Sequence, residues 1–227
     1  MALFDWVLSY WTFDEWSWTA VNDELGANNW TATSMTRTTW IISNCGSFDG
    51  STKYVTLANS PDSTLISNAW TISYWMNKAW NPSSIMASIV SNDNSSWARQ
   101  FVAWINTSWQ FYFERAGAQI ASWWTIMSNS TWYNVVVSYN WTNVISYLNA
   151  WAANTTNTMT ALPTTANVLN FGRRQYTGSN KYFYWLIDEV CIRDRVLSSW
   201  ERTELYNSGS WVQYSATAST SNMFQMF

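Results

Sequence analysis

The sequence predicts an all-β protein, a two-sheet antiparallel β-sandwich, on three observations. First, polar and apolar residues alternate with a period of two in segments such as 71–76 and 132–139, which is the pattern of a strand with one buried face. Second, these segments are rich in β-branched and aromatic residues, which strands favour. Third, clusters of Asn, Ser, Thr and Gly separate such segments at intervals of roughly ten residues, as in β-sandwiches.

Further strands are expected wherever the same pattern returns. They are segments 111–114, 144–148, 168–171 and 186–192. The side chains that we expect in the core are Phe48, Trp75, Val135, Val137, Val190 and Ile192. A helical or parallel α/β structure would contradict this prediction.

One short helix is expected near the C-terminus, over residues 198–206. Ser198 or Ser199 suits the N-cap, because a hydroxyl there accepts a hydrogen bond from a free backbone N–H group. Glu201 suits the first turn, and Gly209 follows at a place where glycine commonly ends a helix.

The chain is expected to form one domain, residues 1–210, followed by a tail or linker, residues 211–227. Its 227 residues are enough for one large β domain with a full core. After Gly209 the composition changes to mostly Ser, Thr and Ala, and the apolar segment 223–227 ends the chain. Segments of this composition rarely pack into a core.

Composition narrows the classes of function. The net charge is -3, only 11 % of residues are charged and no basic block occurs, so a nucleic-acid partner is not expected. Apolar runs are too short for membrane insertion. The segment 1–5 lacks the basic and long apolar regions of a signal peptide. We therefore expect either a fragment or a chain that leaves the cell by another route, for example in a virion.

Histidine is absent and there are two cysteines, Cys45 and Cys191. The absence of histidine removes the commonest general base and zinc ligand, together with Ser-His and Cys-His catalysis. The cysteines are expected on the outer face of the sandwich, because Phe48, Val190 and Ile192 face the core. A disulfide and a pair of free thiols are both open interpretations.

Several of these segments, in this order, resemble laminin-G-like domains of the concanavalin A-like lectin/glucanase superfamily. Residues 9–15 resemble the opening strand of these domains, and residues 47–55 resemble their "FDG" hairpin. The remaining matching segments are 71–76, 132–139, 170–173 and 186–192. One such motif is weak, but several in order over about 200 residues are specific.

The resemblance implies a jelly roll that meets ligands at edge loops or on the concave sheet. It implies a non-catalytic recognition module, carbohydrate-binding or adhesive, on a secreted, surface or virion protein, with a glycan or surface polysaccharide as partner. The alternative is a structural virion or surface-assembly component that contacts other virion or surface proteins. A glycoside hydrolase is less expected, because the paired carboxylates of a Glu-x-Asp-x-x-Glu motif are absent.

Two loops carry candidate ligand-binding residues. Asp93, Asn94 and Trp97 lie in one, and Tyr176 and Asn180 lie in the other. Short polar groups beside an aromatic ring suit sugars, whose hydroxyls need hydrogen bonds and whose C–H faces stack on rings. The same composition also describes an ordinary solvated loop. The adjacent Arg173 and Arg174 are expected as surface charge, although one of them could serve an acidic sugar.

Asp188 is the most informative polar residue. It is expected on the same side of its strand as Val190 and Ile192, facing inward, where a carboxylate needs partners. The family resemblance implies a structural calcium ion held by Asp188, with Asp14 or the carbonyls near it completing the site, since calcium prefers oxygen ligands. The alternative is a hydrogen-bonded structural aspartate without a metal.

Tryptophan and glycine usage is inverted, with 20 tryptophans and 7 glycines. The tryptophans that stand where the resembling domains have glycine in turns are Trp16, Trp18, Trp30, Trp141 and Trp185. Those that match family tryptophans are Trp11, Trp75 and Trp132. One interpretation is a tryptophan-rich, sugar-stacking surface. The interpretation that we favour is that UGA codons read as glycine in the source were translated as tryptophan, which would leave exposed indoles at positive φ.

Overall fold

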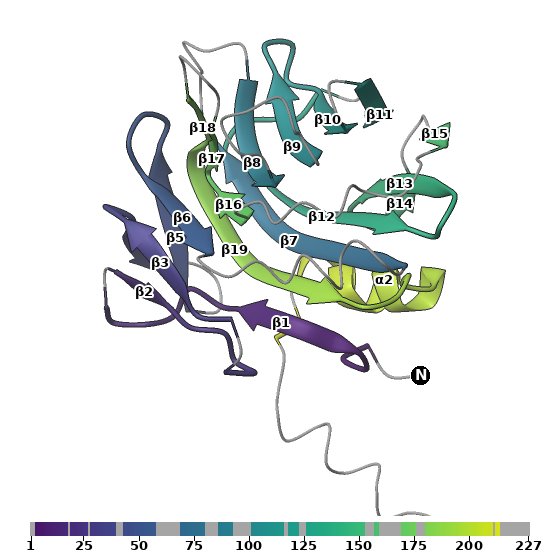
Figure 1. Ribbon diagram of the computed structural model, residues 1–227, viewed down its shortest axis with the longest axis horizontal. Coiled ribbons are helices and arrows are strands. Elements are labelled where there is room, and N and C mark those ends of the chain that lie inside the picture. The colour runs from purple at the N-terminus through teal and green to yellow at the C-terminus, as the bar shows by residue number, and fades with distance from the viewer. Residues whose placement is uncertain are drawn as a thin grey trace, which may run out of the picture.

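The computed structural model describes residues 3–17, 19–26, 28–39, 43–57, 69–79, 86–92, 101–115, 118–122, 126–152, 157–158, 169–175, 180–210 and 212–213. Two antiparallel sheets face each other in the described part, as Figure 1 shows. The predicted all-β sandwich is therefore confirmed, as is the short helix near the C-terminus. Among the described residues, no helix has the length and apolar character needed to cross a membrane.

The first sheet has nine strands in the order β14-β13-β12-β7-β19-β5-β4, with β1 pairing with β19 and β15 with β13. Its strands are β1 (Val7–Trp11), β4 (Thr36–Thr39), β5 (Asn44–Asp49), β7 (Trp70–Lys78), β12 (Trp132–Tyr139), β13 (Asn143–Leu148), β14 (Trp151–Ala152), β15 (Asn157–Thr158) and β19 (Tyr184–Arg193). The long strands β7, β12 and β19 lie at its centre, where they are fully paired.

The second sheet has eight strands in the order β11-β10-β9-β8-β16-β6-β3-β2. They are β2 (Ala20–Val21), β3 (Trp30–Thr33), β6 (Tyr54–Leu57), β8 (Met86–Asn92), β9 (Phe101–Asn106), β10 (Phe111–Arg115), β11 (Ala118–Ser122) and β16 (Leu169–Phe171). Directly after β16 the chain forms a separate small hairpin, β17 (Arg173–Arg174) and β18 (Lys181–Tyr182). This hairpin becomes important for the candidate site.

The main core lies between the two sheets and is built by the side chains that alternation turns inward. Phe48, Val135, Val137, Val190 and Ile192 belong to it, as predicted. Trp75 is buried too, as predicted, but on the opposite side of its sheet. There its ring lies 6.0 Å from the ring of Tyr206, nearly parallel to it.

The short helix α2 (Ser199–Tyr206) covers that opposite, outer face of the nine-stranded sheet (Figure 1). A smaller cluster of buried apolar side chains fills the space beneath it: Leu3, Val136, Tyr147, Leu197 and Leu205. Ser198 is the N-cap, and it forms a capping box with Glu201. The predicted cap and first-turn residue are thus confirmed.

Cys45 and Cys191 lie on the neighbouring strands β5 and β19, and both thiols are free. Each alternates with residues of the main core, so both lie on the outer face of their sheet, as predicted. Both are nevertheless buried. Of the two open interpretations, the structure therefore favours the pair of free thiols.

A β-bulge interrupts β19 and changes one prediction. The pairing of β19 with β7 shifts between Asp188 and Cys191, and Glu189 has a φ of 52°. Ile187 and Val190 both reach the main core, so one extra residue is accommodated between them. The expectation that Asp188 shares the side of Val190 and Ile192 is wrong, because strict alternation does not continue through a bulge.

Candidate functional site

Of the loop residues that the sequence indicated, Asp93, Asn94, Trp97 and Tyr176 lie outside the described residues. Asn180 is described and exposed, directly before β18. Its amide Nδ2 donates a hydrogen bond to the hydroxyl of Tyr182 at 3.1 Å. The described part of the predicted binding surface therefore lies at the β17–β18 hairpin, next to the eight-stranded sheet.

The outer face of the eight-stranded sheet carries a row of mostly polar side chains. Residues directly opposite in an antiparallel pair share a face, and the observed registers align one residue from each of six neighbouring strands. The row runs through Thr31, Thr56, Asn170, Ser91, Val102 and Glu114. We call it the polar row. The sequence could not indicate it, because it depends on registers between strands far apart in the chain.

Arg173 connects the β17–β18 hairpin to the polar row. Its Nη2 donates to the side-chain oxygen of Asn170 at 2.8 Å, and Thr56 donates to the same oxygen at 2.9 Å. The hydroxyl of Ser91 donates to the carbonyl of Arg173 at 2.7 Å. These bonds fix both the backbone and the guanidinium of Arg173 against the sheet.

The guanidinium of Arg173 also lies over an aromatic ring. Its central carbon is 3.5 Å from the ring centroid of Tyr54, and the ring of Tyr182 lies 6.4 Å from that of Tyr54. No carboxylate among the described residues pairs with Arg173. A guanidinium held in this way keeps its charge available for an anionic group, because arginine pairs with carboxylates in a planar geometry.

Arg174 has a different environment from its neighbour. It is only 3 % exposed, and its Nη2 lies 4.0 Å from the Glu114 carboxylate at the end of the polar row. The expectation of two surface charges therefore does not hold for Arg174, which is buried beside an acidic partner. Tyr54, Arg173, Asn180 and Tyr182 together form what we call the hairpin site, with ring faces, amide and hydroxyl groups and one cation.

The residues indicated for calcium, Asp14 and Asp188, lie close enough to each other for their charges to interact. Burial raises the pKa of Asp188 well above its ordinary value, and the charge of Asp14 raises it further. Asp14 accepts a hydrogen bond from the backbone N–H of Asn44 at 2.9 Å, and Asp188 accepts one from the N–H of Glu189 at 3.0 Å.

For this pair of carboxylates, the calcium ion stays a prediction. Calcium takes 6–8 oxygen ligands, yet the thiol of Cys45 lies near both carboxylates. Burial, and then the charges of Asp188 and Asp14, raise the pKa of this thiol. Among the described residues, no group of three or more acidic, Cys or His side chains could hold a metal ion. Both carboxylates accept hydrogen bonds from backbone N–H groups, as the structural alternative requires.

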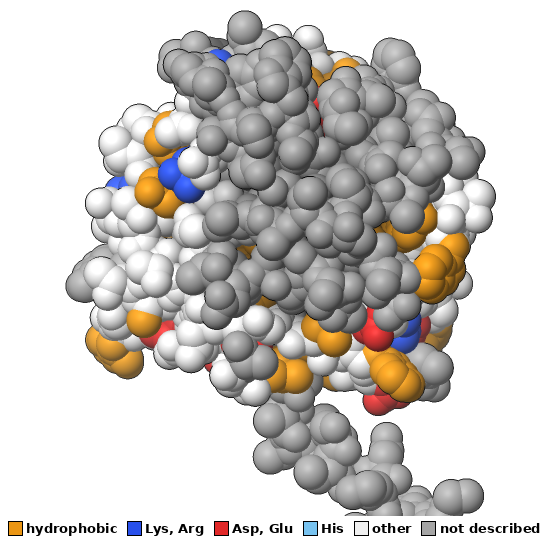
Figure 2. All heavy atoms as spheres, in the orientation of Figure 1, with side chains coloured by type: hydrophobic (Ala, Val, Ile, Leu, Met, Phe, Trp, Pro, Cys, Tyr) orange, Lys and Arg blue, Asp and Glu red, His pale blue; other side chains and the backbone are white. Residues whose placement is uncertain are grey.

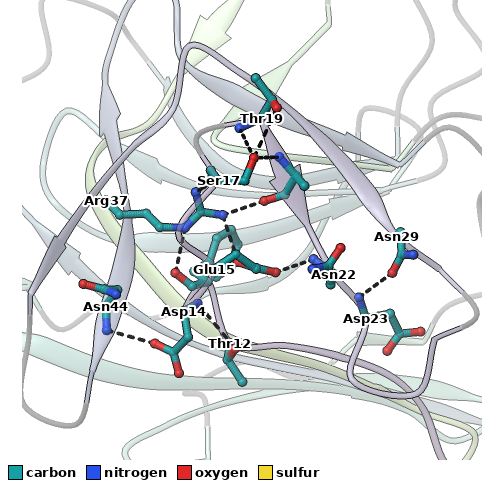
Figure 3. A network of polar contacts seen from close by, with 12 residues as sticks. Thr12, Asp14, Glu15, Ser17, Thr19, Asn22, Asp23, Asn29, Arg37 and Asn44 are labelled. Carbon is teal, nitrogen blue, oxygen red and sulfur yellow. Dashed lines mark hydrogen bonds and ion pairs between the residues drawn. The ribbon is translucent and has the colours of Figure 1, made fainter.

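Asp14 lies at the margin of a polar network around Arg37, which Figure 3 shows. Arg37 donates to the carbonyls of Phe13 at 2.8 Å and Ala20 at 2.6 Å, and it pairs with Glu15 at 2.8 Å. A further bond runs to the carbonyl of Ser17. The network satisfies the backbone of the segment between β1 and β2. Its chemistry is structural, since its polar groups bind one another.

Two further features of the described chain were considered as sites. Glu189 is 7 % exposed, and burial raises its pKa to about 8, but a carboxyl so covered cannot meet a polymeric substrate. A cavity of about 500 Å³ opens beside Arg195, Trp200 and Glu201. Arg195 and Glu201 pair at 2.6 Å within it and support the cap of α2. Both Glu189 and the groups around the cavity therefore have a structural role.

Comparisons with solved structures agree with the fold. A sialidase from Trypanosoma rangeli matches with a TM-score of 0.73 at 12 % identity, over 90 % of this chain and 33 % of that one. The binding domain of botulinum neurotoxin DC, solved in complex with SialylT, matches with a TM-score of 0.69 at 14 % identity, over 91 % of this chain and 52 % of that one. The chain thus spans about a third and about half of these proteins.

Sequence comparison gives the family. No curated protein sequence matches the chain. Residues 49–201, however, match the family described as the concanavalin A-like lectin/glucanases superfamily, in its laminin-G-like branch. This match runs from the end of β5 to the first turn of α2, so it includes the central strands β7, β12 and β19 and the hairpin site, whereas β1 to β4 precede it. The chain therefore belongs to the concanavalin A-like lectin/glucanases superfamily.

Proposed function

We propose that this chain is a non-catalytic glycan-binding module that meets an acidic sugar at the hairpin site. The observation that carries the proposal is the guanidinium of Arg173, held on the ring of Tyr54 and by Asn170 with no carboxylate partner among the described residues. A sugar carboxylate or sulfate would supply the missing anion. The exposed Asn180 and the hydroxyl of Tyr182 lie beside it for the sugar hydroxyls.

The comparisons support this proposal through the fold alone. One neighbour is a toxin binding domain in complex with SialylT, and another is a sialidase. The names of both neighbours refer to sialylated or related sugars, which carry a carboxylate. The low identities mean that no residue role is transferred from either protein.

The absence of catalysis is part of the proposal. Glycoside hydrolysis needs two carboxyl groups about 5–9 Å apart across an accessible bond. The hairpin site has no carboxylate among its four residues, and the acidic group at the end of the polar row, Glu114, is buried beside Arg174. A surface glycan as ligand also places the module outside the cell or on a virion surface.

The test is a glycan array and a binding titration with acidic and neutral oligosaccharides. Arg173→Gln should weaken binding of acidic glycans about tenfold or more, since a charge-assisted bidentate bond is lost. Arg202→Gln is the matched control, because Arg202 also lies over a tyrosine, 3.8 Å from the ring centroid of Tyr147, but on the other sheet. The control should leave binding unchanged.

Two results would contradict the proposal. Equal loss of binding in Arg173→Gln and Arg202→Gln would place the ligand elsewhere, and release of reducing sugar from a bound glycan would show an enzyme. Absence of any glycan ligand, with retention on purified surface or virion proteins, would favour the assembly role instead.

A further inference from the structure

Four tryptophans have backbone conformations that belong to glycine. The φ angle is 62° at Trp6, 65° at Trp109, 74° at Trp141 and 126° at Trp185. Positive φ occurs in a few per cent of residues other than glycine and is an outlier for a bulky side chain. Thirteen of the 20 tryptophans are described, so nearly a third of them show it. Among all other described residues that are not glycine, only eight have positive φ, so this conformation is concentrated at tryptophan.

The turn at Trp141 shows what the backbone requires. Tyr139 pairs with Val144, and the N–H of Asn140 bonds the carbonyl of Asn143 at 3.2 Å, which leaves a two-residue hairpin loop, Trp141–Thr142. Of these two residues, only Trp141 has positive φ. A two-residue loop with positive φ at its first position alone is the type II′ pattern, whose first position is characteristically glycine.

The conformation at Trp185 is more extreme. Its φ of 126° lies beyond the left-handed region near 50–70° that other residues sometimes visit. It lies within β19, where Trp185 pairs with Phe48 on one side and Lys78 on the other. Backbone of this kind is favourable only without a Cβ atom. The true glycines behave alike: four of the five described ones, Gly26, Gly50, Gly172 and Gly209, have positive φ.

The exposed tryptophans do not form one sugar-stacking surface. Trp141 and Trp151 lie beyond opposite ends of β13, which is six residues long and therefore about 20 Å. Trp16 is 97 % exposed and precedes Ser17, which Arg37 of the edge strand β4 binds at the opposite edge of the sheet. Figure 2 likewise shows hydrophobic side chains at several separate places around one face.

Other tryptophans are genuine core residues. Trp11, Trp70 and Trp75 are at most 2 % exposed, and none has positive φ. Trp30 departs from expectation: it is 3 % exposed and stacks on Phe171 at 4.5 Å, so the forecast of an exposed turn residue is wrong there. Trp18 lies outside the described residues. The backbone criterion, and not exposure, therefore selects the positions.

We infer that the functional protein carries glycine at positions 6, 109, 141 and 185, each encoded by a UGA codon that the source reads as glycine. The same residue type recurs at four unrelated backbone positions, and a single reassigned codon explains all four. The inference concerns the chain itself and is independent of the proposed glycan binding. It also removes these four indoles from any ligand surface.

Thermal unfolding of two four-site variants tests the inference. The variant with Trp6→Gly, Trp109→Gly, Trp141→Gly and Trp185→Gly should have a melting temperature about 5 °C or more above that of the unchanged protein. The reason is that the relief of left-handed strain at the four sites adds up. The variant with alanine at the same positions should gain clearly less, since alanine keeps the Cβ atom. Equal gains would overturn the inference, because indole bulk and not backbone conformation would then be the cause.

Single substitutions and a second group of tryptophans provide controls. Trp109→Gly should gain least, since Lys78 Nζ lies 3.9 Å from the indole centroid and that contact is lost. Glycine at Trp11, Trp70 and Trp75, with ordinary φ, should lower the melting temperature or prevent folding. A gain at these core sites as large as at the four positions would contradict the inference.

Peptide mass spectrometry of protein from the natural source gives an answer that does not depend on folding. Peptides that span positions 6, 109, 141 and 185 should each have the mass calculated with glycine at that position. The peptide that contains Trp75 should have the mass calculated with tryptophan. Tryptophan in the first group, or UGG codons at those positions in the gene, would overturn the inference.

Discussion

Asp188 lies directly opposite Trp75 where β19 pairs with β7, and both side chains are buried. Opposed residues in an antiparallel pair share a face, so the carboxyl lies on the outer face of the sheet beside an indole. Burial raises the pKa of Asp188 well above its ordinary value, the hydrogen bond from the Glu189 N–H opposes this only in part, and Asp14 adds to it. The fold therefore favours the protonated carboxyl.

Asp188→Asn should stabilise the protein at neutral pH. A carboxyl whose pKa is higher in the folded state binds its proton more strongly there, so the free energy of unfolding falls as the pH rises above about 4, the unfolded value. The amide removes the titration while keeping the shape. Urea unfolding from pH 4 to pH 8 should show a flatter profile for Asp188→Asn than for the unchanged protein.

The same variant tests the calcium expectation. If calcium bound Asp188, the ion would raise the melting temperature of the unchanged protein, chelation would lower it, and Asp188→Asn would remove the effect. We expect no change on chelation, because Asp14 and Asp188 already accept hydrogen bonds from backbone N–H groups. A calcium-dependent rise that Asp188→Asn abolishes would restore the metal site.

Gly172→Ala should be strongly destabilising. A Cβ atom at Gly172 would lie 2.2 Å from Cδ1 of Phe48, and φ is 75°. Displacement of a core ring together with left-handed strain should cost about 3 kcal/mol or more. Gly26→Ala is the control: φ is 78°, but nothing lies within 4 Å of the new atom. It should cost about 1 kcal/mol in the same denaturation experiment.

Ser198→Ala should remove the cap of α2 at a cost of about 1 kcal/mol, whereas the adjacent Ser199→Ala should have little effect. Although burial opposes it, hydrogen bonds from Arg195 and Ser198 lower the pKa of Glu201 to about 2. The stabilisation by Glu201 is therefore present above about pH 4.5 and is lost as the pH falls towards 2. Acid unfolding of Glu201→Gln beside the unchanged protein would measure it; identical profiles would contradict it.

Neither thiol should react in the native protein. Burial is the largest cause that raises the pKa of Cys191 to about 11, and burial also raises that of Cys45. Thiolate is the reactive form, so a thiol reagent at pH 8 should modify both residues only after denaturant is added. Rapid labelling of the folded protein would show that the outer face of the sheet opens.

Period-two patterning was sufficient to predict the sandwich strands and the core positions, and the capping residues predicted the helix, because each depends on neighbours in sequence. The bulge at Glu189 defeated the same reasoning, since one extra residue reverses the side on which Asp188 lies. The polar row was beyond reach for another reason. Thr56 and Asn170 bond across 114 positions of sequence, and no local pattern encodes which strands become neighbours.

The candidate site divides in the same way. Asn180 was foreseen because short polar and aromatic residues cluster in its loop. Tyr54 was missed, since only the folded chain brings its ring beneath Arg173. Arg173 itself was noticed as a charge. The sequence did not indicate that Arg173 lies over Tyr54 while Arg174 is buried beside Glu114, because both contacts depend on the folded chain.

The pairing of β1 with β19 has a consequence for how the protein is made. The central strand β19, which β1, β5 and β7 all contact, follows every other described strand of the two sheets in the sequence and so leaves the ribosome after them. Until then β5 and β7 expose unpaired edges, and the sheet cannot close. Pairing over such long separations slows folding and prolongs the period in which a growing chain can aggregate. The nine-stranded sheet therefore cannot close before β19 has left the ribosome.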